Sequence, residues 1–290
     1  MAILGSGNIG TDLLMKVRRS EVLEISRFIG KNKNSENLKM AVEMGIPVSA
    51  KSIRELVENP GCCQIVFDAT SANAHVIHAP ILRKMGVFTI DLTPSRIGKA
   101  CIPAINGDQC LGEKNINLIT CGGQATVPIA YELSKISGDI AYIETVSTIA
   151  AKSAGKGTRD NIDEFIETTR DALCQFTGVK NTKSIMILNS AEPPINMRNT
   201  IYVRMPGMDL ECVADAIAQV EKRMQEYVPG YKVIVGPTYI NGILAVTVQV
   251  TGRGDYLPEY SGNLDIITCA AVEMAERYAR QMIGREGWQF

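Results

Sequence analysis

The first part of the chain alternates between short hydrophobic runs and longer segments with helical spacing. Residues 2–4 and 23–29 are short hydrophobic runs, and between them the hydrophobic residues fall on one helical face, at Ile9, Leu13, Leu14 and Val17. This pattern predicts a βαβ unit. Further buried strands, each preceded by a segment that can form a helix, are predicted at residues 64–67, 87–90 and 116–119. Short strands separated by helices predict an α/β fold with a parallel, doubly wound sheet.

Beyond about residue 135 the pattern changes to longer runs in which polar and hydrophobic residues alternate. These runs predict a mostly antiparallel sheet with strands at residues 140–150, 183–188, 200–204, 231–235 and 243–250. Helical spacing at residues 162–176 and 210–227 predicts two helices over one face of that sheet. A last helix, at residues 264–283, is expected to pack back on the first domain.

The change of pattern predicts two domains, which suits a chain of 290 residues. The first is expected to span residues 1–120, joined by a C-terminal helix at residues 263–285. The second is expected to span residues 121–262 and to be an α+β domain.

Composition narrows the classes of partner. The formal net charge is -1, 46% of residues are hydrophobic and 21% are charged, so nucleic acid and anionic membranes are not expected partners and a small molecule is. Hydrophobic runs are too short for a membrane span, and the first residues lack a signal-peptide pattern, so we expect a cytoplasmic protein. The eight cysteines form no Cys-x-x-Cys pair, and neither a metal site nor a disulfide framework is expected.

A glycine motif follows the first predicted strand and opens the first predicted helix. Gly5-Ser6-Gly7-Asn8-Ile9-Gly10 has the form G-x-G-x-x-G. In this context the backbone amides at the helix start face a pyrophosphate, and the glycines allow it to approach closely. The motif therefore predicts a Rossmann-type dinucleotide-binding domain, with a tight turn that binds no ligand as the alternative.

The end of the second predicted strand bears on the choice of cofactor. An Asp or Glu that selects NAD is expected about 20 residues after the glycines, but residues 26–35 contain no carboxylate. They contain Arg27, Lys31 and Lys33, which could accept the 2′-phosphate of NADP or could belong to a solvated surface loop. NAD and NADP both remain open.

Cys121 is the candidate nucleophile. It lies between a predicted strand and a helix predicted at residues 127–136, and Gly122 and Gly123 follow it. A helix N-terminus stabilises a thiolate, and the glycines leave room for a substrate and supply amides for an oxyanion. The alternative is a buried structural cysteine at a tight turn.

Several segments resemble the acylating acetaldehyde dehydrogenases of aromatic hydrocarbon catabolism. In order, and across nearly the whole chain, they are GSGNIGTDL, FDATSA, DLTP, TCGGQAT, KSAGKGTRDNIDEF, AEPP, YVPGY, DYLP and GNLDI. The resemblance implies a Rossmann-type domain followed by a catalytic and dimerisation domain, and a homodimer. It also implies oxidation of acetaldehyde with NAD and coenzyme A to acetyl-CoA, and a complex with 4-hydroxy-2-oxovalerate aldolase.

The resemblance assigns roles to particular residues. The acyl-thioester cysteine corresponds to Cys121, and the cofactor contacts correspond to Ser6, Gly7, Asn8, Ile9, Ser153, Ala154, Gly155, Lys156, Gly157, Thr158, Arg159, Asp160, Asn161 and Asn263. Glycines and cations in the loop at 153–161 suit a phosphate, although residues 161–164 also fit a helix-capping box. Asn263 could orient a nicotinamide amide or cap the last helix.

The chain also departs from the family pattern. Asn199 stands where an Asp is expected. We therefore treat Asn199 as a catalytic candidate and expect the activity of the protein to be altered. The alternative is that Asn199 hydrogen-bonds a strand end. The other two departures are the missing carboxylate after the second strand and a shorter segment after Tyr231.

Two other functions fit the same residues. A semialdehyde or acyl-phosphate reductase shares the two-domain plan and the cysteine, but usually employs a histidine base. His75 and His78 are the only histidines, and nothing in their local sequence places either one at Cys121. The third reading is a weakly active, nucleotide-binding scaffold for an aldolase, for which Asn199 is the argument.

Overall fold

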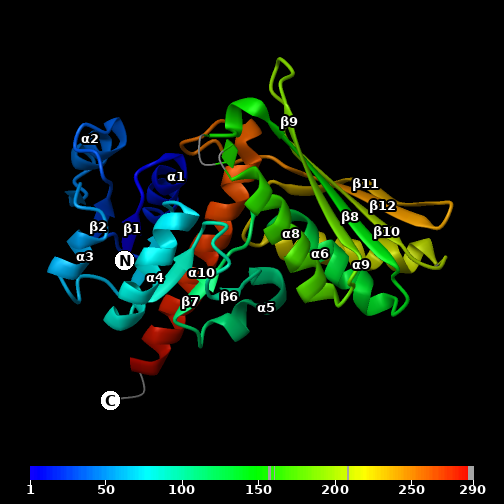
Figure 1. The fold of residues 1–290 in the computed structure, drawn as a ribbon, viewed down its shortest axis with the longest axis horizontal. Coiled ribbons are helices and arrows are strands. Elements are labelled where there is room, and N and C mark those ends of the chain that lie inside the picture. The colour runs from blue at the N-terminus through cyan, green and yellow to red at the C-terminus, as the bar shows by residue number, and fades with distance from the viewer. Residues whose placement is uncertain (156–157, 160, 208, 287–290) are drawn as a thin grey trace. The chain divides into compact units, whose positions relative to one another are not determined.

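The computed structural model describes residues 1–155, 158–159, 161–207 and 209–286 (Figure 1). The chain forms two compact units. The first comprises Met1–Leu118 and Thr268–Phe290, and the second comprises Ile119–Ile267.

The first unit contains a seven-stranded sheet in which the paired strands are parallel. Its strand order is β3-β2-β1-β4-β5-β7-β6. The strands are β1 (Ala2–Leu4), β2 (Arg27–Ile29), β3 (Val48–Ser49), β4 (Ile65–Asp68), β5 (Phe88–Asp91), β6 (Lys99–Ala100) and β7 (Asn115–Asn117). From β1 to β3 successive strands are added on one side, and from β4 onward they are added on the other side of β1, as in a doubly wound dinucleotide-binding sheet. The predicted α/β class is confirmed.

Helices connect these strands. They are α1 (Asn8–Val17), α2 (Glu36–Glu43), α3 (Arg54–Glu58), α4 (Ala72–Met85) and α5 (Pro103–Cys110). The predicted apolar face of α1 is real, because Leu13, Leu14 and Val17 are buried. The last helix, α10 (Gly262–Glu286), contributes its C-terminal part to this unit, where Tyr278 stacks on Phe88 with ring centroids 4.1 Å apart.

Two predicted strands are shorter than expected. The run at 23–29 forms a strand only from Arg27, and the backbone before it bonds to Met1: Met1 donates to the Glu24 carbonyl and Ser26 donates to the Met1 carbonyl. The run at 116–119 ends as a strand at Asn117, and Ile119 takes a positive φ of 56°. That left-handed turn redirects the chain toward Cys121.

The second unit contains a five-stranded mixed sheet of order β11-β12-β10-β8-β9. Its strands are β8 (Tyr142–Ala150), β9 (Thr182–Asn189), β10 (Met197–Arg204), β11 (Tyr231–Ile240) and β12 (Ile243–Val250). All pairs are antiparallel except β8 with β9. Along β8 the residues alternate between buried and half-buried, as the sequence pattern predicts.

Three helices cover one face of this sheet (Figure 1). The predicted pair are α8 (Ile162–Thr177) and α9 (Leu210–Gln225), and α6 (Cys121–Ile136) is the third. Helix α6 contacts α8, α9 and strands β8, β10 and β12, so it lies at the centre of the layer. Short 3-10 turns at Ala151–Ser153 and Glu259–Ser261 complete the unit.

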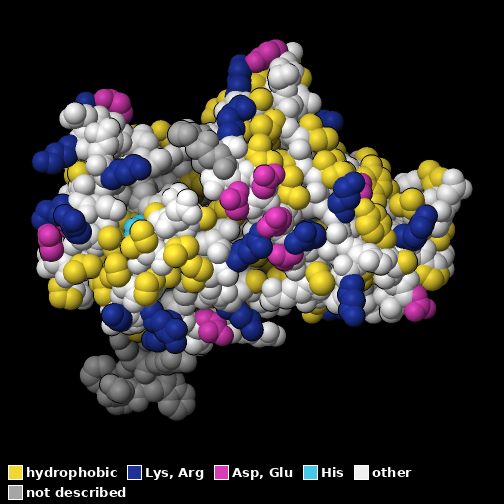
Figure 2. Space-filling view, viewed as in Figure 1, with side chains coloured by type: hydrophobic (Ala, Val, Ile, Leu, Met, Phe, Trp, Pro, Cys, Tyr) yellow, Lys and Arg dark blue, Asp and Glu magenta, His cyan; other side chains and the backbone are white. Residues whose placement is uncertain are grey.

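The surface carries charged side chains of both signs, in agreement with the net charge of -1. Lys and Arg side chains are interspersed with Asp and Glu over the face shown in Figure 2. No helix in the described part of the chain is long and apolar enough to cross a membrane.

Candidate active site

Cys121 is the first residue of α6, and side-chain hydrogen bonds hold the turn that precedes it. Thr120 is the N-cap, and its hydroxyl accepts a hydrogen bond from the Gly123 amide at 2.9 Å. The same hydroxyl lies 2.7 Å from the hydroxyl of Thr169 on α8, which donates to the Phe165 carbonyl at 2.8 Å. Since the Thr169 proton is committed, Thr120 donates to Thr169. The start of α6 at Cys121 is thereby tied to α8 by a buried chain of hydrogen bonds.

The glycines after Cys121 are required by packing. A Cβ on Gly122 would lie 2.7 Å from Ser147 Oγ and 2.9 Å from Phe165 Cζ, and a Cβ on Gly123 would lie 2.6 Å from Ile119 Cδ1. The chain's own side chains therefore occupy the space where side chains of these two residues would lie, and room for a substrate at the Cys121 sulfur stays a prediction. Gly123 is also not a free oxyanion donor, since its amide caps the helix.

The electrostatics of Cys121 differ from the sequence expectation. Burial raises the pKa of the Cys121 thiol to about 12, although the amides of Gly122 and of Cys121 itself hydrogen-bond the sulfur and lower it. Desolvation of the thiolate therefore outweighs the effect of the helix start. The resting thiol is therefore neutral near pH 7, and a nucleophilic role for Cys121 would require a group that removes its proton.

This protonation state gives a first prediction. In the free enzyme with Cys212, the exposed thiol, replaced by serine, Cys121 is expected to react slowly with iodoacetamide at pH 7. Its rate should rise roughly tenfold per pH unit up to about pH 10, because only the thiolate reacts. Peptide mass spectrometry measures the modification at Cys121. A rate that is already at its plateau at pH 7 would show a preformed thiolate and contradict the burial argument.

Asn199 lies in the middle of β10, on the face of the sheet that the helices cover. Its side chain is fully buried, and neither Oδ1 nor Nδ2 has a hydrogen-bond partner among the described residues. It is in register with Ser147, whose Oγ is the atom beside Gly122. An unpaired polar group in a core costs about 1–3 kcal/mol. The alternative role, hydrogen bonding at a strand end, does not fit a residue in mid-strand with no such bond.

The glycine motif of the first unit has the shape that a pyrophosphate needs. Gly7 is the N-cap of α1 without any side-chain capping bond, and a Cβ on Gly7 would meet nothing within 4 Å. Gly5 has a φ of 117°, and a Cβ there would lie 2.5 Å from the Ala69 carbonyl oxygen. A Cβ on Gly10 would lie 1.8 Å from the Gly5 carbonyl oxygen. The start of α1 therefore has no side-chain cap, is open at Gly7 and is closely packed at Gly5 and Gly10. This arrangement fits a dinucleotide phosphate.

The cations near the second strand are not equivalent. Arg27 donates to Glu55 at 3.3 Å and to the Ser26 carbonyl at 2.7 Å, so it is committed to its own neighbourhood. Lys31 and Lys33 are exposed in the loop after β2. Only these two of the three predicted cations are placed to accept a phosphate.

Comparisons with known proteins find relatives that match nearly the whole chain. Residues 121–258 match the family described as prokaryotic acetaldehyde dehydrogenase, dimerisation. The chain is 50% identical to an acetaldehyde dehydrogenase of Spirochaeta aurantia, over 97% of this chain and 94% of that protein. It is 46% identical to acetaldehyde dehydrogenases of Pectobacterium atrosepticum and Geobacillus stearothermophilus, over 98% and 99% of this chain and 97% and 98% of those proteins.

The chain belongs to the acetaldehyde dehydrogenase family. A nicotinamide cofactor follows from membership, and the matched dimerisation region supports a homodimer. Among solved structures, an aspartate semialdehyde dehydrogenase II from Vibrio cholerae has a TM-score of 0.66 at 15% identity, over 96% of this chain and 97% of that one. At that identity the likeness concerns the fold, a dinucleotide-binding sheet with a second sheet domain.

The loop that the acetaldehyde dehydrogenase resemblance assigns to the cofactor is described in part. Lys156, Gly157 and Asp160 lie outside the described residues. Arg159 donates to the carbonyls of Ala151 and Ala154 at 2.8 and 3.0 Å, so it holds the loop's own backbone. The remaining members are Ser153, which donates to the Ala150 carbonyl, and Gly155, Thr158 and Asn161.

The two capping alternatives are not supported. Asn161 is the N-cap of α8 but makes no side-chain capping bond, so the predicted capping box does not form. Asn263 is the second residue of α10 and lies inside the helix. It is 1% exposed, and its Oδ1 has no partner in the described part of the chain. A buried amide oxygen left unpaired fits a ligand contact better than a cap.

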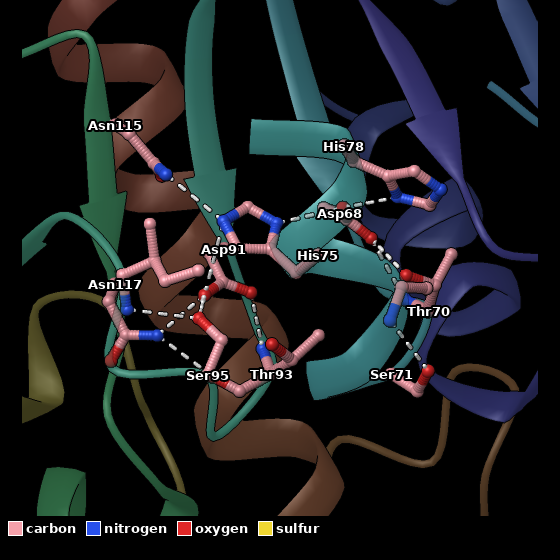
Figure 3. A network of polar contacts seen from close by, with 12 residues as sticks. Asp68, Thr70, Ser71, His75, His78, Asp91, Thr93, Ser95, Asn115 and Asn117 are labelled. Carbon is pink, nitrogen blue, oxygen red and sulfur yellow. Dashed lines mark hydrogen bonds and ion pairs between the residues drawn. The ribbon is translucent and has the colours of Figure 1, made fainter. Parts of the chain in front are cut away.

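Both histidines belong to a polar network at the ends of β4 and β5 that the sequence did not reveal (Figure 3). Asp68 Oδ2 accepts from the Nδ1 atoms of His75 and His78 at 2.8 and 2.9 Å, and Asp68 Oδ1 accepts from Thr70. Burial raises the pKa of Asp68, but these hydrogen bonds outweigh it and leave it at about 2. Both imidazoles are thus committed to Asp68.

Proposed function

We propose that this chain oxidises acetaldehyde or a similarly short aldehyde, with NAD as hydride acceptor and coenzyme A as acyl acceptor, through a thioester on Cys121. The observation that carries the proposal is the placement of Cys121 at the start of α6, with two backbone amides directed at its sulfur. We assign dinucleotide binding to the first unit, and catalysis and dimerisation to the second. Since NAD and coenzyme A are cytosolic metabolites, we place the enzyme in the cytoplasm.

The chain's own residues supply the covalent chemistry. The Cys121 thiolate adds to the aldehyde carbon, and the oxyanion that forms is held by the amides of Cys121 and Gly122. A dinucleotide held at the glycine motif would supply the acceptor for the hydride of that carbon. The product is an acyl thioester on Cys121, from which the thiolate of coenzyme A displaces the cysteine. Asn199 is neutral and cannot take the thiol proton, so turnover is slow near neutral pH.

Two groups of residues are proposed to contact the cofactor. Ser6, Gly7, Asn8 and Ile9 are proposed to hold the pyrophosphate at the start of α1, because their amides are uncapped. The loop at 153–161 and Asn263 are proposed to hold the rest of the dinucleotide. The orphaned amide oxygen of Asn263 is the strongest support in the second unit.

Weak discrimination between NAD and NADP is a second prediction. The loop at residues 30–35 after β2 contains no carboxylate, while Lys31 and Lys33 are exposed there. The kcat/KM values for NAD and NADP are expected to differ by much less than a thousandfold, which would correspond to about 4 kcal/mol. The double variant Lys31→Glu/Lys33→Glu should lose NADP use selectively, with Lys84→Glu on α4 as the control. A preference for NAD above a thousandfold in the natural chain would mean that another group excludes the phosphate.

A homodimer suits the uncovered face of the second sheet. Ile187, Tyr202 and Ile243 are exposed on the side away from α6, α8 and α9, and their exposed fractions are 43%, 37% and 37%. Large apolar side chains on one sheet face form a surface for a second copy. We propose this face as the dimer interface.

We also propose an aldolase partner, 4-hydroxy-2-oxovalerate aldolase, from the family resemblance. The two proteins are expected to co-elute when expressed together, and aldehyde made by the aldolase should reach Cys121 without full release. The measurement is the inhibition of coupled NADH formation by an added aldehyde trap such as semicarbazide. Separate elution with complete inhibition by the trap would remove the partner from the account.

The direct assay of the proposed reaction measures NADH and acyl-CoA from acetaldehyde. Both products are expected in equal amounts, and steady turnover should require coenzyme A. Steady NADH formation with acetate as product would indicate a hydrolytic aldehyde dehydrogenase. Turnover only with a semialdehyde and phosphate would favour the reductase alternative.

A further inference from the structure

His75 is a buried imidazole that lies between two buried carboxylates of the first unit (Figure 3). It belongs to α4, and its two partners, Asp68 and Asp91, are the last residues of the paired strands β4 and β5. His75 Nδ1 lies 2.8 Å from Asp68 Oδ2, and His75 Nε2 lies 3.5 Å from Asp91 Oδ2. One ring therefore bridges the carboxyl ends of two neighbouring strands.

Asp91 is surrounded by donors that favour its anion. Its Oδ1 accepts from the Thr93 amide at 2.8 Å, and its Oδ2 accepts from Ser95 Oγ at 2.6 Å and from Asn117 Nδ2 at 2.7 Å. Burial raises the pKa of Asp91, and His75, Ser95 and Thr93 oppose that rise. Donors that converge on a carboxylate stabilise its charged form, so the proton that Asp91 and His75 compete for belongs on His75.

The protonation state of His75 decides whether its contact with Asp91 is attractive. In the neutral ring the N–H is on Nδ1, where Asp68 accepts it, and the bare Nε2 faces Asp91 Oδ2. In the charged ring Nε2 also carries a proton, and the same contact becomes an ion pair. Burial lowers the pKa of His75, but Asp68 and Asp91 outweigh burial and raise it above its usual value.

Asn115 on β7 can follow this proton. Its Nδ2 lies 3.0 Å from His75 Nε2, and its Oδ1 is buried without a hydrogen-bond partner among the described residues. The amide nitrogen donates to the bare Nε2 of the neutral ring. When Nε2 is protonated, half a turn of the amide presents Oδ1 as the acceptor. The surroundings of His75 therefore accommodate both of its protonation states.

Asp68 connects His75 to the glycine motif. Its Oδ1 accepts from the Thr70 amide, and between them the Ala69 amide donates to the Leu4 carbonyl at 2.8 Å. The carbonyl oxygen of Ala69 is the atom that would lie 2.5 Å from a Cβ on Gly5. The turn that Asp68 holds is therefore packed against the first glycine of the proposed pyrophosphate site.

The charge at this edge of the sheet depends on His75. The titratable groups that face it in the described part of the chain are Asp68 on β4, Asp91 on β5 and, through Asp68, His78 on α4, while β7 contributes the uncharged Asn115. A neutral His75 leaves both carboxylates uncompensated at the carboxyl edge, where a dinucleotide binds in such sheets. A charged His75 offsets one of them, which favours an anionic pyrophosphate.

We propose that His75 is a positioning residue for the dinucleotide, and that the proton it holds between Asp68 and Asp91 strengthens cofactor binding at the glycine motif. The inference rests on the proposed function, because the glycine motif is the proposed site. Binding and protonation are linked reciprocally. If the proton favours NAD, bound NAD must raise the pKa of His75.

Calorimetric titration with NAD from pH 6 to pH 9 measures this link. NAD is the probe because none of its own groups titrates in that range. The Kd for NAD is expected to rise about fivefold or more as His75 loses its proton, the usual size of a coupling between two sites. Near the pKa of His75, NAD binding should take up protons, which appears as a binding enthalpy that differs between buffers of different ionisation enthalpy.

His75→Asn is the test variant, because an amide nitrogen in place of Nδ1 can still donate to Asp68 but does not titrate. Its Kd for NAD should be flat from pH 6 to pH 9, near the value of the natural chain at pH 9. His78→Asn is the matched control, since it removes the other histidine bonded to Asp68, and it should keep the rise with pH. A histidine that only supported the fold would lower the melting temperature when replaced, but the rise of Kd with pH would remain.

Nuclear magnetic resonance supplies a measurement that does not depend on His75→Asn. The chain has only two histidines, so labelled histidine gives two ring signals, and the His78→Asn spectrum retains that of His75. Saturating NAD should move the titration of His75 to higher pH. An unmoved titration, a Kd that is flat with pH in the natural chain, or the same rise in His75→Asn overturns the inference.

The same experiments separate this inference from the proposed function. A natural chain that binds neither NAD nor NADP removes both. A natural chain that binds NAD and makes acyl-CoA, with a Kd for NAD that does not depend on pH, removes only the role of His75.

Discussion

Replacing Cys121 with serine is expected to abolish the formation of NADH that depends on coenzyme A. The serine hydroxyl is a far weaker nucleophile than a thiolate at neutral pH, and the ester it would form is a poor acyl donor to a thiol. The loss in kcat/KM should be at least about a thousandfold, because removal of a covalent nucleophile leaves only binding and oxyanion donors. The initial rate of NADH formation with saturating acetaldehyde and coenzyme A is the measurement.

Cys212→Ser is the matched control, because Cys212 is an exposed cysteine on α9 in the same unit. It should keep the natural rate within about twofold. The Cys121→Ser protein should keep the natural affinity for NAD and its melting temperature, which would exclude misfolding. More than about a hundredth of the natural rate remaining in Cys121→Ser would rule out the covalent mechanism.

Asn199→Asp is expected to accelerate the reaction by up to about 100-fold, the contribution of one positioned acid or base. The Cys121 thiol has a pKa of about 12 and is neutral at pH 7, so a carboxylate at position 199, on the strand that α6 contacts, would serve as the missing proton acceptor. The gain should be small at low pH, where the carboxyl is protonated, and should appear as pH rises. Rates measured from pH 5 to 9 test this.

The same substitution should reduce stability as pH rises. Burial raises the pKa of the new carboxyl in the folded state above its value in the unfolded state. Between these two pKa values the unfolded chain binds fewer protons than the folded chain, so the free energy of unfolding falls as pH rises. Asn189→Asp, at the end of β9, is the control for a new carboxylate in a strand of the same sheet. A flat rate in Asn199→Asp would leave the nucleophile in place and remove any catalytic role from residue 199.

The fold was predictable where the sequence pattern was local. The apolar face of α1 and the alternation along β8 depend on spacing within one element, and both are as predicted. The start of α6 was placed too late, at Val127 instead of Cys121, because Gly122 and Gly123 suggest a turn. Both glycines are nevertheless helical, and Phe165 and Ser147 lie close to Gly122, a contact that sequence spacing does not encode.

The site was predictable in its residues but not in its electrostatics. Cys121 and the glycine motif stand out in the sequence, and Thr120 could have been found as a threonine just before a helix. Its bond to Thr169, 49 residues away, could not. Nor could the raised pKa of Cys121, since burial is a property of the packed unit.

The network around Asp68 and Asp91 was missed for a similar reason. Each Asp ends a parallel strand, but its partners come from α4, β7 and the following loops. No pattern in the sequence indicated that His75 would lie between two carboxylates. The single usable signal was that both Asp residues lie where strands end, at the edge where ligands bind in such sheets.

The central claim is that the acyl group is carried on Cys121, and trapping it is the most direct test. The protein is mixed with acetaldehyde and NAD without coenzyme A, quenched in acid and digested for peptide mass spectrometry. We expect one burst of NADH, up to one per active site, and an acetyl group on Cys121 that added coenzyme A removes as acetyl-CoA. NADH formation with no acetyl group on Cys121, or with the acetyl group on another residue, would contradict it.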